Sequence, residues 1–424
     1  MVALARSSDP PVTTQTLADH DHAMAAAPPP PELNDDVIPE ILLRLPPDEP
    51  ASLFRASLAC KPWRRVLSDP AFLRRYRSFH RAPPLLGFFD GNNSPDFCPV
   101  AAASPFSMPA FDCILQYVLD CRHGRVLFQL TEDLLVWDPI TGRREDVPEQ
   151  ELDILLENAV ILCAAAGCDH RDCHGGPFLV VGVGLATDDD DDMHDSSVQA
   201  SVYSSQVGAW QPSVYLQLEV DFDAQYPWDR LILRSSGAVV GDEVYFLLSP
   251  DAGNKILKYN LGRHCLSTID LPANVDCWGV ALMPAGDGLL GLASSTWDSS
   301  LYLWSRLRML NAEGVAGWVQ LRVIEMRAVL PVTITDCKVR VIGFAEGVNV
   351  VFVGTCVGTF TINLESGLAR KVSPTVYGPV LPFMSFYTPG MVLALCSLFF
   401  KKILRHMASI FYYELLVLIY VDFS

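Results

Sequence analysis

Five side chains that can bind a metal ion lie close together in the middle of the 424-residue chain. They fall within a single segment that ends at a pair of glycines. Thiolate sulfur and imidazole nitrogen are the donors that structural zinc sites use, in tetrahedral sets of four. This segment is therefore the first candidate for a chemical role. The five donors are Cys163, Cys168, His170, Cys173 and His174.

The spacing of these donors argues against zinc. Compact structural zinc sites usually pair two ligand clusters that are separated in the sequence, and this chain has only one cluster. His170, Cys173 and His174 come just before Gly175 and Gly176, which suits a turn between two strands. We therefore expect free thiols and turn histidines, without a bound metal or another cofactor. Zinc is the alternative.

Other chemical patterns are weak or missing. The acidic run from Asp188 to Asp192 is followed by His194 and Asp195, but it lacks the alternating ligands and the bend glycine of a calcium loop. Like charges repel, so we expect an exposed loop there. The sequence contains no Gly-rich phosphate loop, no Gly-x-Ser-x-Gly elbow and no His-Glu-x-x-His motif. We therefore predict no catalytic residues and a protein that is not an enzyme.

The best-defined element of the chain is a short helical module near its N-terminus. Apolar residues at helical spacing follow cap-type residues at Asn34 and Asp35, and Pro46 and Pro47 end this first helix. Prolines and acidic residues then delimit a second and a third helix within residues 48–70. A three-helix unit of this size buries little surface, so part of its apolar face should meet a partner.

The module resembles an F-box. The Leu-Pro pair at Leu45 and Pro46 matches that family, as do the stretch at residues 57–61, Trp63 and the Asp-Pro-Ala-Phe ending at residues 69–72. The family usually begins with Leu-Pro, and this chain has Leu33-Asn34 instead. The resemblance implies a docking unit for a Skp1-type adaptor and, through the adaptor, a cullin. The residues predicted to bind the adaptor are Leu33, Ile38, Ile41, Leu42, Leu45, Pro46, Leu53, Leu58 and Trp63.

Composition describes the remainder of the chain. Half of the residues are hydrophobic, so a sizeable core is expected beyond the helical module. Lys and Arg number 31 against 49 Asp and Glu, and the net charge of −18 disfavours binding to nucleic acid. Twelve irregularly spaced cysteines do not form a disulfide framework, which indicates the reducing cytoplasm or nucleus.

Residues 85–390 have the texture of many short strands. Three stretches share a strand–turn–strand pattern that ends in a polar hairpin, at residues 124–142, 255–272 and 350–367, and a weaker copy covers residues 289–320. Irregular repeats of this size are typical of β-propeller blades. Because the copies are unevenly spaced, a β-sandwich is the alternative.

This region resembles the kelch-like, F-box-associated half of a large plant family. The Val-Trp-Asp-Pro-Ile-Thr-Gly element at residues 136–142 and the Gly-Trp-Val-Gln element at residues 317–320 carry the resemblance. It implies a β-rich domain that holds a target protein. The predicted fold class is thus α+β and multidomain, with a three-helix F-box at residues 32–80 followed by an all-β, propeller-like domain at residues 85–390.

The two ends of the chain differ from these domains. Residues 1–31 are rich in Ala and Pro without a continuous apolar segment, so we expect a flexible leader and no secretory signal. The tail at residues 391–424 is apolar but is broken by Lys401, Lys402 and Glu414. Neither apolar piece reaches the roughly 20 residues that a spanning helix needs, so we do not expect membrane insertion. A packed segment, a membrane anchor and an aberrant terminus are its three interpretations.

Together these features predict a non-catalytic substrate receptor of a cullin-type ubiquitin ligase. The F-box would dock the adaptor, the β-rich half would hold a target, and the transfer chemistry would belong to other subunits. Two alternatives come from other classes: a scaffold that binds the adaptor without directing degradation, and a kelch-type propeller enzyme. The enzyme would need a metal or a nucleophile at the propeller axis.

Overall fold

A computed structural model describes residues 36–389, apart from residues 92–95, 102–116, 132, 149–153, 172, 187–196, 219–230, 287, 297–298, 311–315, 332–337, 375 and 377. The predicted leader, the acidic run and the apolar tail therefore lie outside the described residues. Among the described residues, no helix is long and apolar enough to cross a membrane.

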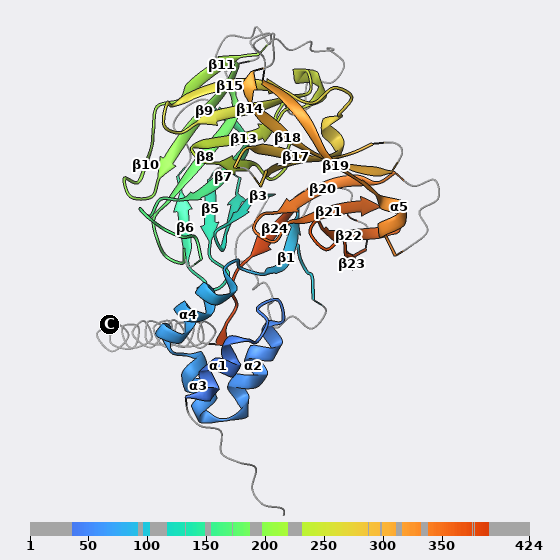
Figure 1. Ribbon diagram of the computed structural model, residues 1–424. Helices are drawn as coiled ribbons and strands as arrows, with labels where there is room; N and C mark the ends of the chain where they lie inside the picture. The colour runs from blue at the N-terminus through green and yellow to red at the C-terminus, as the bar shows by residue number, and fades with distance from the viewer. Residues whose placement is uncertain are drawn as a thin grey trace, which may run out of the picture.

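Four helices form a small bundle at one end of the molecule (Figure 1). Prolines occupy the first turn of α2 and α3, where a missing N–H costs least. The sequence pattern predicts three helices, with Asp69-Pro70 only as a stop signal. The same pair also starts a fourth helix, because the Asp69 carboxylate accepts a hydrogen bond from the Ala71 N–H at 3.1 Å. The helices are α1 (Val37–Leu43), α2 (Pro50–Ala59), α3 (Lys61–Leu67) and α4 (Pro70–His80).

The bundle core takes in a residue from the other end of the described chain. Phe386, which follows the last strand, is only 2 % exposed and packs among the apolar side chains of the helices. Its ring lies edge-on to the ring of Tyr76 in α4, with centroids 6.2 Å apart. The next residue, Tyr387, contacts Phe54 of α2 at 5.2 Å between ring centroids. The segment after the last strand, about 300 residues beyond the helices in the sequence, therefore joins the helical module to the β domain.

The β domain is a six-bladed propeller of antiparallel sheets (Figure 1). Blade 1 contains β3 (Tyr117–Arg122), β4 (Arg125–Gln129), β5 (Leu134–Trp137) and β6 (Arg144–Val147). Blade 2 contains β7 (Ile154–Cys163), β8 (Phe178–Ala186), β9 (Ser197–Ser204), β10 (Ala209–Trp210) and β11 (Val214–Gln217). Blade 3 contains β12 (Ala238–Val240), β13 (Glu243–Leu247), β14 (Lys255–Asn260) and β15 (Cys265–Asp270).

The remaining blades complete the ring. Blade 4 contains β16 (Val280–Pro284), β17 (Leu290–Ser295), β18 (Ser300–Leu310) and β19 (Ala316–Glu325), and blade 5 contains β20 (Arg340–Ala345), β21 (Val350–Thr355), β22 (Gly358–Asn363) and β23 (Ala369–Ser373). Blade 6 contains β24 (Val380–Met384), β1 (Leu85–Asp90) and β2 (Phe97–Pro99). Short helices η1 (Pro250–Ala252), η2 (Cys277–Gly279) and α5 (Met326–Val329) lie between strands.

Blade 6 closes the ring by pairing the two ends of the β domain. Strand β1, the first of the chain, lies antiparallel to β24, the last, with Phe88 opposite Pro382. Such closure leaves no open sheet edge between the first and last blades, which stabilises a circular arrangement. The first strands of neighbouring blades contact one another around the axis: β24 with β3, β3 with β7, β12 with β16, β16 with β20 and β20 with β24.

The predicted propeller is confirmed, and the β-sandwich alternative is wrong. The four repeats recognised in the sequence coincide with hairpins of blades 1, 3, 4 and 5, namely β4–β5, β14–β15, β17–β19 and β21–β22. Each blade buries apolar faces against its neighbours; the packed cluster between blades 2 and 3, for example, includes Val181, Val202, Phe246 and Leu257. The kelch-like subtype stays a prediction.

Candidate functional site

The predicted adaptor-binding residues divide into three groups by exposure. Ile41, Pro46 and Leu58 are exposed, and Leu58, at 82 %, is the most accessible of them. Leu45 and Trp63 are half-buried against the bundle core. The side chains of Ile38, Leu42 and Leu53 are buried inside the bundle, so they support its fold and do not present a surface to a partner. Leu33 lies outside the described residues.

Two further apolar side chains of the bundle face solvent. Val37 is exposed one turn before Ile41 on α1, so both lie on one face of that helix. Phe79 on α4 is 53 % exposed, and the site prediction from sequence missed it because α4 itself was not foreseen. Exposed Leu, Ile and Phe side chains on so small a unit are the residues a partner would cover.

The propeller axis opens toward the helical bundle through a cavity of about 310 Å³. The linker between α4 and β1 lines this opening with Arg81, Ala82 and Pro83. Residues at or just after the ends of inner strands of blades 1, 4 and 5 line it as well, among them Arg122, Pro284 and Glu346. We call this cavity the near opening.

Arg122 joins three blades at the near opening. Its guanidinium lies 3.4 Å from the Asp120 carboxylate of the same strand and 2.7 Å from the Glu346 carboxylate after β20. It also donates a 2.7 Å hydrogen bond to the carbonyl oxygen of Gly237, just before β12. Arg122 has little exposed surface and Asp120 has none, so water screens this network weakly.

Asp120 is a buried carboxylate whose charge depends on Arg122. Complete burial raises the pKa of Asp120, and the Arg122 charge and the Ile161 N–H, which donates to the carboxylate at 3.0 Å, offset only part of that rise. Its second oxygen, Oδ1, has no hydrogen-bond partner among the described residues. Asp120, through Ile161, and Arg122, through Glu346 and Gly237, therefore connect blades at an electrostatic cost. Removal of Arg122 would leave the buried charge of Asp120 uncompensated.

The opposite end of the axis opens into a larger cavity of about 730 Å³. Strand starts of three blades line it through Tyr117, Val280 and Arg340, and Trp278 projects beside them with 57 % of its surface exposed. The Ser249 hydroxyl, which also lines the cavity, is buried and has no hydrogen-bond partner in the described part of the chain. We call this cavity the far opening; it combines aromatic, cationic and hydroxyl groups, the mixture that protein recognition sites use.

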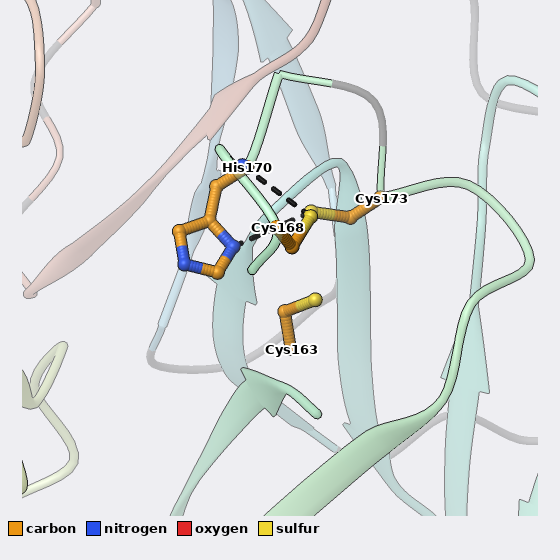
Figure 2. A group of neighbouring side chains, drawn as sticks. All are labelled: Cys163, Cys168, His170 and Cys173. Atoms are coloured by element: carbon orange, nitrogen blue, oxygen red, sulfur yellow. Dashed lines mark hydrogen bonds between the residues drawn. The ribbon is translucent and has the colours of Figure 1, made fainter. Parts of the chain in front are cut away.

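Three of the five cysteines and histidines singled out in the sequence, His170, Cys173 and His174, line the near opening. Cys163 is the last residue of β7, and Cys168, His170 and Cys173 come from the loop between β7 and β8. One donor atom of each of these four residues lies within 4.8 Å of the donor atoms of the other three (Figure 2). The structure therefore brings together four of the five predicted donors, although the sequence argument did not foresee their convergence.

The fifth donor, His174, points to a different partner. Its Nδ1 lies 2.7 Å from the carboxylate of Asp138, the residue just after β5. Burial opposes the charge on Asp138, but the hydrogen bond and charge of His174 outweigh it and lower the pKa of that carboxyl. Asp138 also accepts hydrogen bonds from the N–H groups of Ile140 and Thr141, so the Trp-Asp-Pro-Ile-Thr-Gly element forms a capped turn that holds the β7–β8 loop.

Comparisons with known proteins identify the helical module. The family described as the F-box domain matches residues 31–75. A search of curated proteins finds no sequence that matches the chain. The family match ends at residue 75, so it leaves the ligand of the propeller open.

Solved structures resemble the chain weakly. The extracellular domain of a one-component system from B. thetaiotaomicron is 14 % identical with a TM-score of 0.32; the match covers 64 % of this chain but only 29 % of that one. The Swd1 β-propeller domain of Myceliophteria thermophila is 10 % identical with a TM-score of 0.32, over 60 % of this chain and 73 % of that one. A chain of the mitotic checkpoint complex is 11 % identical with a TM-score of 0.29, over 67 % of this chain and 86 % of that one. Likeness at this level carries no functional argument, and the blade count follows from the strand pairing of the chain itself.

Proposed function

We propose that this chain, in which an F-box domain precedes a six-bladed β-propeller, is the substrate-receptor subunit of a Skp1–cullin-type ubiquitin ligase. The F-box would bind a Skp1-type adaptor, and the adaptor would bind the cullin. The propeller would hold a target protein. The chain itself would then act by holding the target near the transfer machinery, which raises the effective concentration of the target there.

The observation that carries this proposal is that the core of the F-box is fully packed while several of its apolar side chains remain exposed to solvent. Phe386 fills the bundle core together with Leu42 and Leu53, so the helices do not need a partner to bury these groups. Ile41 and Leu58 nevertheless stay exposed. Exposed apolar anchors on a preformed surface favour docking without prior unfolding, which keeps the cost of association low.

The far opening is the better place for a target. The near opening already faces the linker to the F-box, whereas the far opening lies at the other end of the axis and is more than twice as large, about 730 Å³ against about 310 Å³. Trp278 and Arg340 are the residue types that most often dominate protein interfaces. A target bound there would leave the F-box free for the adaptor. The chain would work in the cytoplasm or nucleus, in keeping with the free thiols of the described cysteines.

Replacement of an exposed leucine tests adaptor docking without disturbing the fold. Leu58→Glu places a charge on a side chain that is 82 % exposed, and Leu368→Glu does the same on the propeller at 71 % exposure. Substitutions at such exposed sites usually change stability by less than about 0.5 kcal/mol, so both variants should remain folded. A charged side chain in an apolar docking groove typically costs 2 kcal/mol or more, which is about thirtyfold in affinity.

The measurement is capture of a purified Skp1-type adaptor by the full-length chain. We expect wild type and Leu368→Glu to bind alike, and Leu58→Glu to lose at least about thirtyfold in affinity. Absence of capture by folded wild-type chain would refute the adaptor role. Equal capture by Leu58→Glu would place the docking surface away from Leu58.

A second experiment separates a receptor from a scaffold. Tagged chain is purified from cells in which cullin neddylation is blocked, and the proteins that co-purify are compared with those retained by Trp278→Ala. A receptor predicts at least one protein that co-purifies with wild type, becomes more abundant under the block and is lost from the Trp278→Ala sample while the adaptor is retained. If no co-purifying protein changes in abundance, the scaffold interpretation replaces the receptor.

A further inference from the structure

We propose that Cys163, Cys168, His170 and Cys173 form a structural zinc site at the rim of the near opening. This is the alternative that the sequence argument disfavoured. Compact zinc sites usually pair two separated ligand clusters, but here the end of strand β7 supplies one ligand and the β7–β8 loop folds back to supply three. A strand end is as rigid an anchor as a second cluster would be, so the objection from spacing does not apply to this fold.

The donor distances match those of a tetrahedral zinc centre. Zinc bonds of about 2.3 Å to sulfur and about 2.0–2.1 Å to nitrogen place two sulfurs about 3.8 Å apart, and a sulfur and a nitrogen about 3.6 Å apart. The Sγ atoms of Cys168 and Cys173 lie 3.5 Å apart. Cys173 Sγ and His170 Nδ1 lie 3.6 Å apart. Figure 2 shows the Cys163 side chain pointing toward the same space, and its Sγ lies within 4.8 Å of the other donors.

A disulfide does not explain this geometry. A disulfide needs sulfurs about 2.05 Å apart and pairs only two cysteines. Here the sulfurs of Cys168 and Cys173 are 3.5 Å apart, and the donor atoms of three thiols and an imidazole all lie within 4.8 Å of one another. A cluster of three cysteines with one histidine is instead among the ligand sets that structural zinc uses.

The surroundings of the cluster suit a net negative centre. Three thiolates, one neutral imidazole and one Zn²⁺ together carry a charge of about −1. The nearly buried guanidinium of Arg125 donates hydrogen bonds to the carbonyl oxygens of Cys173, at 2.7 Å, and of Gly176. The backbone N–H of His170 also donates to Cys168 Sγ, with 3.4 Å between the nitrogen and the sulfur. Buried positive charge and N–H donors of this kind stabilise metal thiolates and orient them.

The site would hold the loop that faces the F-box linker. Residues Asp169, His170 and Arg171 of this loop line the near opening together with Arg81 and Ala82 of the linker. Arg125 tethers this loop, Arg143 donates to the carbonyl oxygen of Gly175 at 3.1 Å, and His174 contacts Asp138, but none of these contacts joins the loop to the end of β7. Zinc coordination would fix it to β7 and thereby keep the junction between the F-box and the propeller rigid.

Metal content of the full-length chain provides the first test. The protein is purified without chelator, dialysed and analysed for zinc by mass spectrometry. We expect close to one zinc per chain. Replacement of zinc by Co²⁺ should produce the thiolate charge-transfer band and the strong visible bands of a tetrahedral cobalt site, which hydrogen bonds between free thiols do not produce.

Cysteine variants provide the second test, with a matched control. Cys173 and Cys277 are both buried free cysteines, but only Cys173 belongs to the cluster. Cys173→Ser and the less buried Cys168→Ser should each lose zinc, and a chelator that lowers the melting temperature of wild type by several degrees should leave theirs unchanged. Cys277→Ser should keep its zinc and its response to the chelator.

The outcomes are decisive in both directions. Well under one zinc per folded wild-type chain after incubation with excess zinc, or a melting temperature of wild type that the chelator does not change, would overturn the site. A Cys168–Cys173 disulfide, detected by intact mass in zinc-free protein that was purified without a reducing agent, would also overturn it. If Cys173→Ser fails to fold, the wild-type stoichiometry, the cobalt spectrum and the Cys168→Ser variant still decide the question.

Discussion

Replacement of Phe386 by alanine should loosen the F-box while leaving the propeller folded. Phe386 follows β24, yet its ring is 2 % exposed inside the helical bundle and lies edge-on to Tyr76 at 6.2 Å. Loss of this ring leaves a cavity in the bundle core, whose other buried side chains come from α1 to α4. The perturbation therefore acts on one domain from a residue attached to the other.

The size of the effect follows from the burial of the ring. Truncation of a buried phenylalanine to alanine typically costs about 3–5 kcal/mol, of which a lost aromatic pair accounts for about 0.5–1.5 kcal/mol. A helical unit of about 45 residues has a stability of roughly 2–7 kcal/mol at about 0.05–0.15 kcal/mol per residue. The loss is therefore comparable to the whole stability of the bundle, and its helices should open far more often than in wild type.

Hydrogen exchange of the full-length chain measures this opening. In Phe386→Ala, the amide protons of α2 and α4 should lose most of their protection, whereas those of the inner strands should keep theirs. Phe383→Ala is the matched control, because Phe383 lies three residues earlier, is 1 % exposed and packs within the propeller core instead. That variant should weaken protection in blades 1 and 6 and leave the bundle largely protected.

Two results would refute this reasoning. If Phe386→Ala left protection in α2 and α4 unchanged, the ring would not contribute to the bundle core as its burial indicates. If the two variants weakened the same segments equally, the F-box and the propeller would unfold as one unit, and the separation of their cores would be wrong.

Three further predictions concern the near opening and the limits of the F-box. Arg122→Leu should destabilise the propeller by about 3–5 kcal/mol at neutral pH, because it leaves the Asp120 charge buried without its partner, and adding Asp120→Asn should recover part of the loss in a thermal melt. Burial raises the pKa of Asp120 above its unfolded value, so the stability gained from binding this proton is present at low pH and is lost as pH rises through the native pKa. Removal of the Arg122 charge raises this pKa further, so the deficit of Arg122→Leu should shrink as pH falls below neutral, and a deficit independent of pH would contradict this account. An isolated segment of residues 32–76 lacks the end of α4 and Phe386, so its adaptor affinity should fall below that of the full-length chain, and equal affinity would show that neither is needed.

Local patterns in the sequence were sufficient for the elements that depend on neighbouring residues. The hairpins of blades 1, 3, 4 and 5 consist of short apolar or alternating runs bounded by turn-forming residues, and these features act within about 20 residues. The helical starts at Pro50 and Pro62 are equally local, because proline fits the first turn of a helix. The F-box resemblance rests on the same short-range features, and the match to residues 31–75 confirms it.

Features that join distant segments were not readable from the sequence. Blade 6 pairs β1 with β24, strands that lie almost 300 residues apart, so neither shows a hairpin partner nearby. Phe386 has nothing in its local sequence that assigns it to the F-box core. Burial likewise separated the predicted adaptor residues: helical spacing places Ile38, Ile41 and Leu42 on overlapping faces, but only packing against the other helices decides that Ile41 alone stays exposed.

The sequence by itself determined which side chains could bind a metal, and the tertiary structure decided whether they meet. Thiol and imidazole donors are a property of residue type, so Cys163, Cys168, His170, Cys173 and His174 could be named at once. Their direction depends on how the β7–β8 loop folds back over the end of β7 and on the Asp138 carboxylate that draws His174 away. Coordination requires donors at fixed distances and angles, and only the packing of strands and loops around them sets that geometry.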